Sequence, residues 1–181
     1  MNTASTRDNV TVTTTVDYKT LILEQIAKAP GIRYRELLRL TGLTNGTLEY
    51  HLKILERMHK VNVDRNDGRR ARYYSIDMSA NDAHIIGYVR NNVARQIVSF
   101  ILEHDLCTFR EIVEHISKAP STASWHLKRL HEAGIVTTIF GQEYQLYRVL
   151  NNTLVKEVLW KYKENSWGEM AKRYCEMFGE L

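Results

Sequence analysis

The sequence contains little cysteine: Cys107 and Cys175 are the two in 181 residues, and they stand far apart without Cys-x-x-Cys spacing. A disulfide framework is therefore not expected, and a reducing, intracellular compartment fits best. No apolar run approaches the roughly 20 residues that a membrane span needs, and the Thr-rich N-terminus lacks the apolar centre of a signal peptide. We therefore expect a soluble, cytoplasmic protein with no membrane partner.

Motifs of catalysis and of metal binding are missing as well. The sequence has no phosphate-cradling glycine loop, nucleophile elbow or paired carboxylates, so we expect no enzyme and no cofactor. Its histidines and Cys107 lack the ligand spacing of a metal centre, and we expect no metal site. Lys and Arg number 25 against 21 Asp and Glu, and the net charge of +4 suits a polyanionic partner without requiring one.

What the sequence does contain is one small unit twice. The sequence YHLKIL at residues 50–55 returns as WHLKRL at residues 125–130, and the offset between the two histidines is 126 minus 51, or 75 residues. The same offset carries residues 35–37 (REL) onto 110–112 (REI). A repeat of this length predicts two small domains, each with a modest core, rather than one large domain.

Each copy is predicted to form three short helices followed by a two-stranded hairpin. The first copy has helices at about residues 17–30 and 33–41, a third that begins after Thr44, and strands at 61–63 and 72–76. Leucines at positions 48, 52 and 55 fall at i, i+4 and i+7, so they form the face of the third helix that packs on the first two. The turn signal Asn66-Asp67-Gly68 joins the strands into a protruding wing.

The second copy repeats this order, and a connector precedes it. Residues 79–92 have a helical pattern that is either separate from the next helix or continuous with it. We predict helices at residues 93–104, 108–115 and 120–133, and strands at 135–140 and 144–150. The predicted domains are a flexible N-terminal segment at 1–16, a first unit at 17–78, a connector helix at 79–92, a second unit at 93–150 and C-terminal helices at 151–181.

Two amphipathic helices are predicted beyond the second copy, at residues 154–162 and 167–178, with a capping box at Ser166-x-x-Glu169 between them. Their apolar residues need burial either against their own domains or against the same surface of another chain. We prefer the second interpretation and expect a homodimer that forms through the C-terminal and connector helices. The apolar residues concerned are Leu154, Val158, Leu159, Tyr162, Trp167, Met170, Tyr174 and Met177.

The repeated motif resembles a known family. Thr47-x-x-Tyr50-His51-Leu52-x-x-Leu55, and STASWHLKRL at residues 121–130, each followed by a hairpin, resemble prokaryotic winged-helix regulators related to the ArsR and MarR groups over about residues 18–150. Two such domains with trailing helices look like the tandem winged-helix regulators abundant in archaea. The resemblance implies a mainly α fold with small β-hairpins (α+β), two winged helix-turn-helix domains plus C-terminal helices, and a third helix that enters the major groove.

The residues themselves also point to nucleic acid, because the outward faces of the two third helices carry groups that hydrogen-bond base edges and phosphates. In the first copy these are Asn45, Thr47, Glu49, Tyr50, Lys53 and Arg57. In the second copy they are Ser121, Thr122, Ser124, Trp125, Lys128 and Arg129. An exposed Trp125 needs a partner, either a sugar-phosphate wall or the connector helix or a second subunit. His51 and His126 flank the core stripe, so we interpret them as hydrogen-bonded packing residues rather than ligands.

The two wings differ in charge. The first contains Arg65, Arg69, Arg70 and Arg72, and arginines on a protruding hairpin bind phosphates or enter the minor groove. The second has Gln142 and Glu143 at the corresponding place. We therefore expect the first unit to supply most of the affinity for DNA.

Together these features predict a sequence-specific regulator of transcription that binds double-stranded DNA as a homodimer. The alternative is a winged-helix scaffold or adaptor in a chromosome or transcription complex. The first wing separates the two hypotheses, because an adaptor has little reason to place four arginines there.

Overall fold

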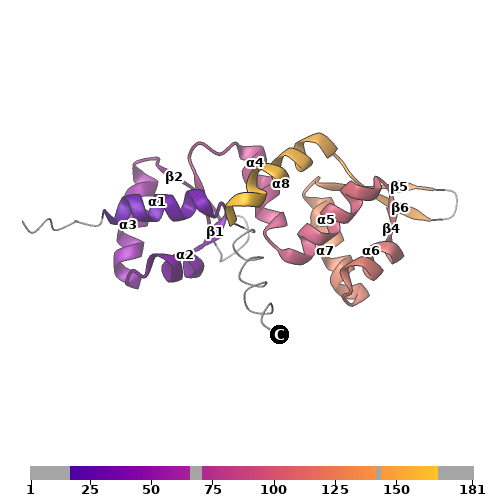
Figure 1. The fold of residues 1–181 in the computed structure, drawn as a ribbon, viewed down its shortest axis with the longest axis horizontal. Coiled ribbons are helices and arrows are strands. Elements are labelled where there is room, and N and C mark those ends of the chain that lie inside the picture. Colours follow the sequence, from indigo (N-terminus) through magenta and orange to yellow (C-terminus); the bar gives the residue numbers. More distant parts are fainter. Residues whose placement is uncertain (1–16, 66–70, 142–143, 167–181) are drawn as a thin grey trace, which may run out of the picture.

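The computed structural model describes residues 17–65, 71–141 and 144–166, and in α8 it describes side chains as far as Tyr162. The chain folds into two similar units joined by a helical connector (Figure 1). The first unit occupies the N-terminal end of the molecule, and the second occupies the opposite end. Within the described residues, no helix is long and apolar enough to cross a membrane.

The first unit has the predicted order of helices and hairpin. Its elements are α1 (Tyr18–Lys28), β1 (Ile32–Arg33), α2 (Tyr34–Thr41), α3 (Asn45–Arg57), β2 (Val61–Asp64) and β3 (Arg72–Ser75). The strands form an antiparallel sheet in the order β1-β3-β2. The two-residue strand β1 was not predicted, because nothing in its own sequence indicates a strand and only its pairing with β3 defines it.

Local chemistry sets the ends of these helices. Asp17 caps α1 by accepting a hydrogen bond from the Lys19 backbone N–H at 3.1 Å. Gly42 ends α2 in the left-handed conformation, with φ of 66°. Thr44 caps α3, where its Oγ1 accepts from the Thr47 N–H at 3.3 Å. The leucine stripe of α3 is buried together with residues of α1 and α2, which confirms the predicted core.

The second unit repeats this arrangement. The elements of the remaining chain are α4 (Ala80–Val89), α5 (Asn92–His104), β4 (Cys107–Thr108), α6 (Phe109–Ile116), α7 (Pro120–Glu132), β5 (Val136–Phe140), β6 (Gln145–Val149) and α8 (Asn152–Ser166). The sheet order β4-β6-β5 matches β1-β3-β2 in the first unit. A mainly α fold with small hairpins, present twice, is therefore confirmed.

The connector is a separate helix that shares the core of the second unit. α4 ends at Val89, and Asn91 starts α5 by accepting from the N–H groups of Val93 and Ala94 at 3.0 and 3.1 Å. The apolar side chains Ile85, Ile86 and Val89 belong to the same buried cluster as α5 and α7. The connector therefore packs as part of the second core.

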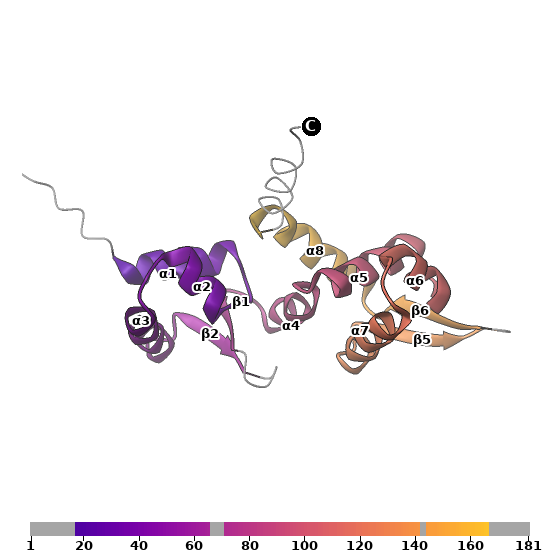
Figure 2. The ribbon, with the colours of Figure 1, turned by 90° about the horizontal axis from the view of Figure 1, so that it is seen from below.

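The last described helix, α8, returns across α4 towards the first unit (Figures 1 and 2). Val158 and Tyr162 are buried in the second core, and Leu154 and Leu159 pack against it. Asp82 of α4 accepts hydrogen bonds from Lys161 Nζ and the Tyr162 hydroxyl, both at 3.2 Å. These apolar residues are thus covered within their own chain and do not require a second copy. The rest of the predicted stripe, Trp167, Met170, Tyr174 and Met177, lies outside the described residues.

Candidate nucleic-acid interface

The outward face of α3 is exposed as predicted. Asn45, Glu49, Lys53 and Arg57 are exposed, and the Tyr50 side chain has 62% of its surface accessible. Thr47 is half-buried, and its hydroxyl lies 2.8 Å from that of the capping Thr44. The same side of the molecule carries α7, and α8 lies on the opposite side (Figure 2).

The first turn of α3 is fixed to α2. The Tyr34 hydroxyl lies 2.8 Å from Asn45 Oδ1 and 2.9 Å from the Asn45 carbonyl oxygen. With its amide oxygen accepting from Tyr34, Asn45 has its two amide N–H donors to offer a base edge. The contact holds the start of the helix in one position before any partner binds.

Lys53 and Glu49 form an ion pair on the exposed face of α3. Lys53 Nζ lies 2.7 Å from Glu49 Oε1, and this hydrogen bond and the lysine charge lower the pKa of Glu49. Both side chains are more than half exposed, so the pair adds little stability. A phosphate can therefore replace Glu49 as the partner of Lys53 at small cost.

His51 packs between aromatic rings behind this face. Its ring lies edge-on to Tyr50 at 5.2 Å and to Tyr18 at 5.6 Å between centroids. Its Nδ1 atom is buried without a hydrogen-bond partner among the described residues. The packed position matches the sequence interpretation, which also expected a hydrogen bond to the ring; Nδ1 makes none with the described residues.

The arginines of the first wing have different environments. Arg65 is exposed and binds Glu56 at the end of α3: its Nη1 lies 2.8 Å from Oε1 and its Nη2 lies 2.9 Å from Oε2. Arg72 is only 8% exposed and donates to the Gly31 carbonyl oxygen at 3.1 Å. Because residues alternate between faces along a strand, Arg72 shares the inner face with the buried Tyr74. The prediction that placed Arg72 on an exposed wing is therefore corrected.

Two further arginines of that wing, Arg69 and Arg70, lie outside the described residues. Their contact with phosphate stays a prediction.

The outward face of α7 is polar with one large aromatic residue. Ser121, Ser124, Trp125 and Lys128 are exposed, and Thr122 and Arg129 are half-buried. Lys128 Nζ lies 3.9 Å from Glu132 Oε1 on the next turn.

Arg129 links Trp125 to the connector helix. Its guanidinium carbon lies 4.8 Å from the Trp125 ring centre and 5.5 Å from that of Tyr88 in α4. A sugar-phosphate wall, the connector helix and a second subunit were the possible partners of Trp125. Within the chain, the connector helix is that partner, and Arg129 mediates the contact. About half of the Trp125 surface stays accessible.

The described residues on either side of the tip of the second wing include exposed apolar side chains, which the sequence prediction missed. Phe140 is 84% exposed, and Tyr144 and Ile139 are also exposed. The signal in the sequence is the adjacent pair Ile139-Phe140 at the end of the strand, because neighbouring strand residues point to opposite faces and cannot both face the core. Gln142 and Glu143 lie outside the described residues.

No cluster of three or more His, Cys, Asp or Glu side chains suited to a metal ion occurs in the parts of the chain that the structure describes.

Comparison with known proteins assigns both units. Residues 16–86 match the family model of an N-terminal HTH domain, and residues 92–138 match that of the bacterial regulatory proteins of the arsR family. In each unit the third helix is followed by a two-stranded wing. The chain is a tandem winged helix-turn-helix protein.

Relatives of this tandem winged helix-turn-helix protein include an uncharacterized HTH-type transcriptional regulator of Methanocaldococcus jannaschii. The two are 29% identical over 120 residues, which cover 66% of this chain and 30% of the relative. The solution structure of a homodimeric winged helix-turn-helix DNA-binding domain from Mycobacterium bovis, a possible ArsR-family regulator, is 16% identical. It aligns with 58% of this chain and 97% of its own, with a TM-score of 0.40.

Proposed function

We propose that this protein is a sequence-specific transcriptional regulator that binds double-stranded DNA. The observation that carries the proposal is the exposed face of α3, where donors and cations project from a helix whose first turn is fixed by Tyr34 and Asn45. Helix-turn-helix proteins place such a helix in the major groove, with its N-terminal residues on base edges. The matches to HTH family models, and the relative named as an HTH-type regulator, support the same function.

The residues of α3 divide into two roles. Asn45, Glu49 and Tyr50 carry hydrogen-bonding groups suited to base edges, and Lys53 and Arg57 carry charges suited to guanine or phosphate. Arg65, together with Arg69 and Arg70, adds phosphate contacts from the wing. Ser121, Thr122, Ser124, Trp125 and Lys128 form the corresponding face of the second domain.

We further propose that two copies act together, each supplying one α3 to a half-site. The face of α8 that carries Trp160, 81% exposed, is the surface we assign to the contact between copies. Light scattering on the full chain measures the mass directly. A dimer that dissociates on Trp160→Ala supports this assignment, and a monomer at all concentrations contradicts it.

The experiment that tests DNA binding is selection of bound duplexes from a random pool, followed by affinity measurement on the selected sequence. Lys53→Ala and Arg57→Ala should weaken binding, whereas Lys28→Ala, which removes an exposed charge from the end of α1, should not. If 6 to 10 phosphates are contacted, affinity falls roughly 10³- to 10⁵-fold between 50 and 200 mM salt. Lack of enrichment, or binding that ignores salt, contradicts the proposal and favours the scaffold hypothesis.

A further inference from the structure

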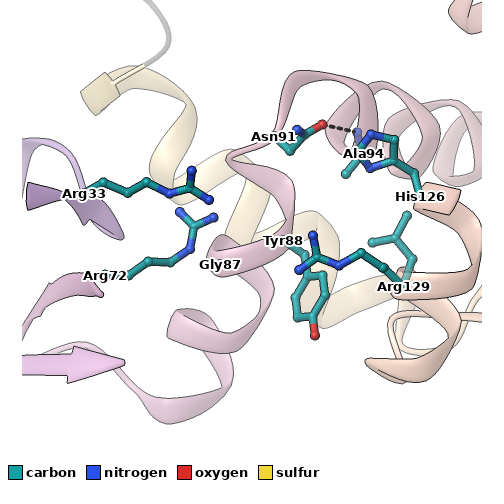
Figure 3. Close-up of a pocket in the computed structure, with 9 residues that line it drawn as sticks. Arg33, Arg72, Gly87, Tyr88, Asn91, Ala94, His126 and Arg129 are labelled. Carbon is teal, nitrogen blue, oxygen red and sulfur yellow. Dashed lines mark hydrogen bonds between the residues drawn. The ribbon is translucent and has the colours of Figure 1, made fainter. Parts of the chain in front are cut away.

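A cavity of about 50 Å³ lies where the two domains meet (Figure 3). The sheet of the first domain contributes Arg33 and Arg72, the start of α5 contributes Asn91, and α7 contributes His126 and Arg129. Arg72 and His126 are each only 8% exposed, so buried polar side chains, and not surface charges alone, border the cavity.

Positive charge is concentrated at this cavity. Arg33 and Arg72 stand directly opposite each other on the antiparallel strands β1 and β3, a position where like charges repel. Figure 3 shows their guanidinium groups side by side, with that of Arg129 extending towards them from α7. Asp64 stands opposite Arg72 on β2 and supplies one negative charge to this row of the sheet. Among the described residues, those that line the cavity include no carboxylate.

The surroundings of the cavity are also basic. Arg90 and Arg95 are sequence neighbours of the lining residues Asn91 and Ala94, and Arg90 is paired with Glu36. Burial, and then the charge of Arg90, lower the pKa of Arg95. Burial, and then the charge of Arg129, lower the pKa of His126. In both groups burial is the larger cause, and the neighbouring positive charge shifts the pKa in the same direction.

We propose that this cavity binds one phosphate group, held by Arg33 and Arg72 from the first domain and by Arg129 from the second. A guanidinium has five N–H donors in a planar fork that fits the oxygens of phosphate in pairs. Since on the order of 10–15 Å³ of such volume holds one water, the cavity accommodates about four water-sized groups. That space fits a phosphate group and excludes a whole nucleotide.

The phosphate group has two possible sources, a small molecule in solution or the backbone of bound DNA. In either case the ligand bridges the domains, because its donors come from both. A bridging ligand favours the arrangement in which the donors converge, and so sets how α3 and α7 are placed relative to each other. Binding of free phosphate does not depend on the proposed function, since it needs no DNA.

The first arm of the test uses the full chain and inorganic phosphate, with chloride at matched ionic strength as the reference. Calorimetric titration and thermal unfolding should show saturable binding and a raised Tm. Arg33→Gln and Arg129→Gln should each weaken binding at least roughly tenfold, because each removes a charge-assisted hydrogen bond. Arg110→Gln, which removes an exposed arginine of α6, should leave it unchanged.

The two site variants lie in different domains, so if one of them fails to fold, phosphate binding can still be measured with the other. Arg33→Lys, which keeps the charge but removes the fork, should recover binding only in part. Saturable binding that is the same in Arg33→Gln and Arg129→Gln as in the unaltered protein overturns the proposal. A binding signal and a rise in Tm that chloride reproduces overturn it as well.

The second arm separates the two sources. If DNA supplies the phosphate, free phosphate binds without saturation, and Arg33→Gln and Arg129→Gln each reduce the slope of log K against log salt by about one. If neither phosphate binding nor the salt slope changes in these variants, the site does not exist. If phosphate binds and no duplex does, the site stands and the proposed regulator function fails.

Discussion

Arg90, directly after the connector helix, holds Glu36 of the first domain. Its Nη2 lies 2.9 and 2.8 Å from the two carboxylate oxygens of Glu36, and its Nη1 donates to the Pro30 carbonyl oxygen at 2.9 Å. The Arg90 side chain is only 14% exposed. Because α4 belongs to the core of the second domain, this single side chain fastens one domain to the other.

Replacing Arg90 should therefore loosen the junction. Arg90→Ala removes three hydrogen bonds from a partly buried site, and we expect a loss of about 2 kcal/mol in unfolding free energy. Small-angle scattering should show a larger radius of gyration as the domains separate. Arg110→Ala is the control, since it breaks an exposed pair with Glu114 and should cost less than about 1 kcal/mol. Equal losses of unfolding free energy in the two variants would show that Arg90 does not hold the junction between the domains.

Tyr74 makes the second link between the domains, and Gly87 leaves room for it. Tyr74 is 2% exposed and lies in the second core, although it belongs to β3 of the first domain. A Cβ at Gly87 would lie 3.2 Å from the Tyr74 hydroxyl oxygen. We expect Gly87→Ala to destabilise the protein by displacing Tyr74, even though alanine favours a helix by about 1 kcal/mol.

The matched control is Gly46→Ala in α3, where a Cβ would meet no heavy atom within 4 Å. This substitution should leave Tm unchanged or raise it. Thermal unfolding of the two variants compares a crowded glycine with an open one. A Tm for Gly87→Ala at or above that for Gly46→Ala would contradict the assigned contact.

Much of the fold is predictable from the sequence because its signals are local. Asp17, Thr44 and Gly42 fix helix ends through neighbours two to four residues away, and the leucine stripe of α3 identifies its buried face. The two-residue strands carry no such signal. Ile32 pairs with Tyr73, so β1 exists only once the chain has returned from the wing.

The errors at the candidate site have the same origin. Whether Arg72 faces solvent depends on strand register and on the approach of Gly31, which is 41 residues away in the chain. The contact of Arg129 with Tyr88 likewise joins α7 to a helix that lies far from it in sequence. The sequence correctly predicted a surface of basic and aromatic side chains. Which arginines lie on that surface depends on tertiary packing, which the sequence does not reveal.

Cys107 should be unreactive in the folded protein. Burial, followed by the nearby charge of Glu111, raises the pKa of its thiol from 9.0 to about 11. Since the thiolate is the reactive form, the shift reduces its fraction about 100-fold near pH 8. Iodoacetamide should therefore label Cys107 far more slowly in native than in unfolded protein, measured by mass spectrometry on a Cys175→Ser background. Similar rates in the two states would show that the thiol is accessible.

His126 should make the stability of the protein depend on pH. Its folded-state pKa lies below the ordinary value of 6.5 because the ring is buried, and because Arg129 is close. The unfolded chain then binds a proton more readily than the folded chain, so stability is complete above about pH 6.5 and falls as pH drops through the lowered pKa. Arg33 and Arg72 line the same cavity as His126.

Chemical unfolding between pH 8 and pH 5, in buffer without phosphate, measures this dependence. His126→Gln removes the titrating group, so its unfolding free energy should change less with pH than that of the unaltered protein. His131→Gln, an exposed position on the same helix, should keep the full dependence. Curves for His126→Gln that run parallel to those of the unaltered protein would assign the loss of stability at low pH to other groups, and would remove His126 from the basic environment of the cavity.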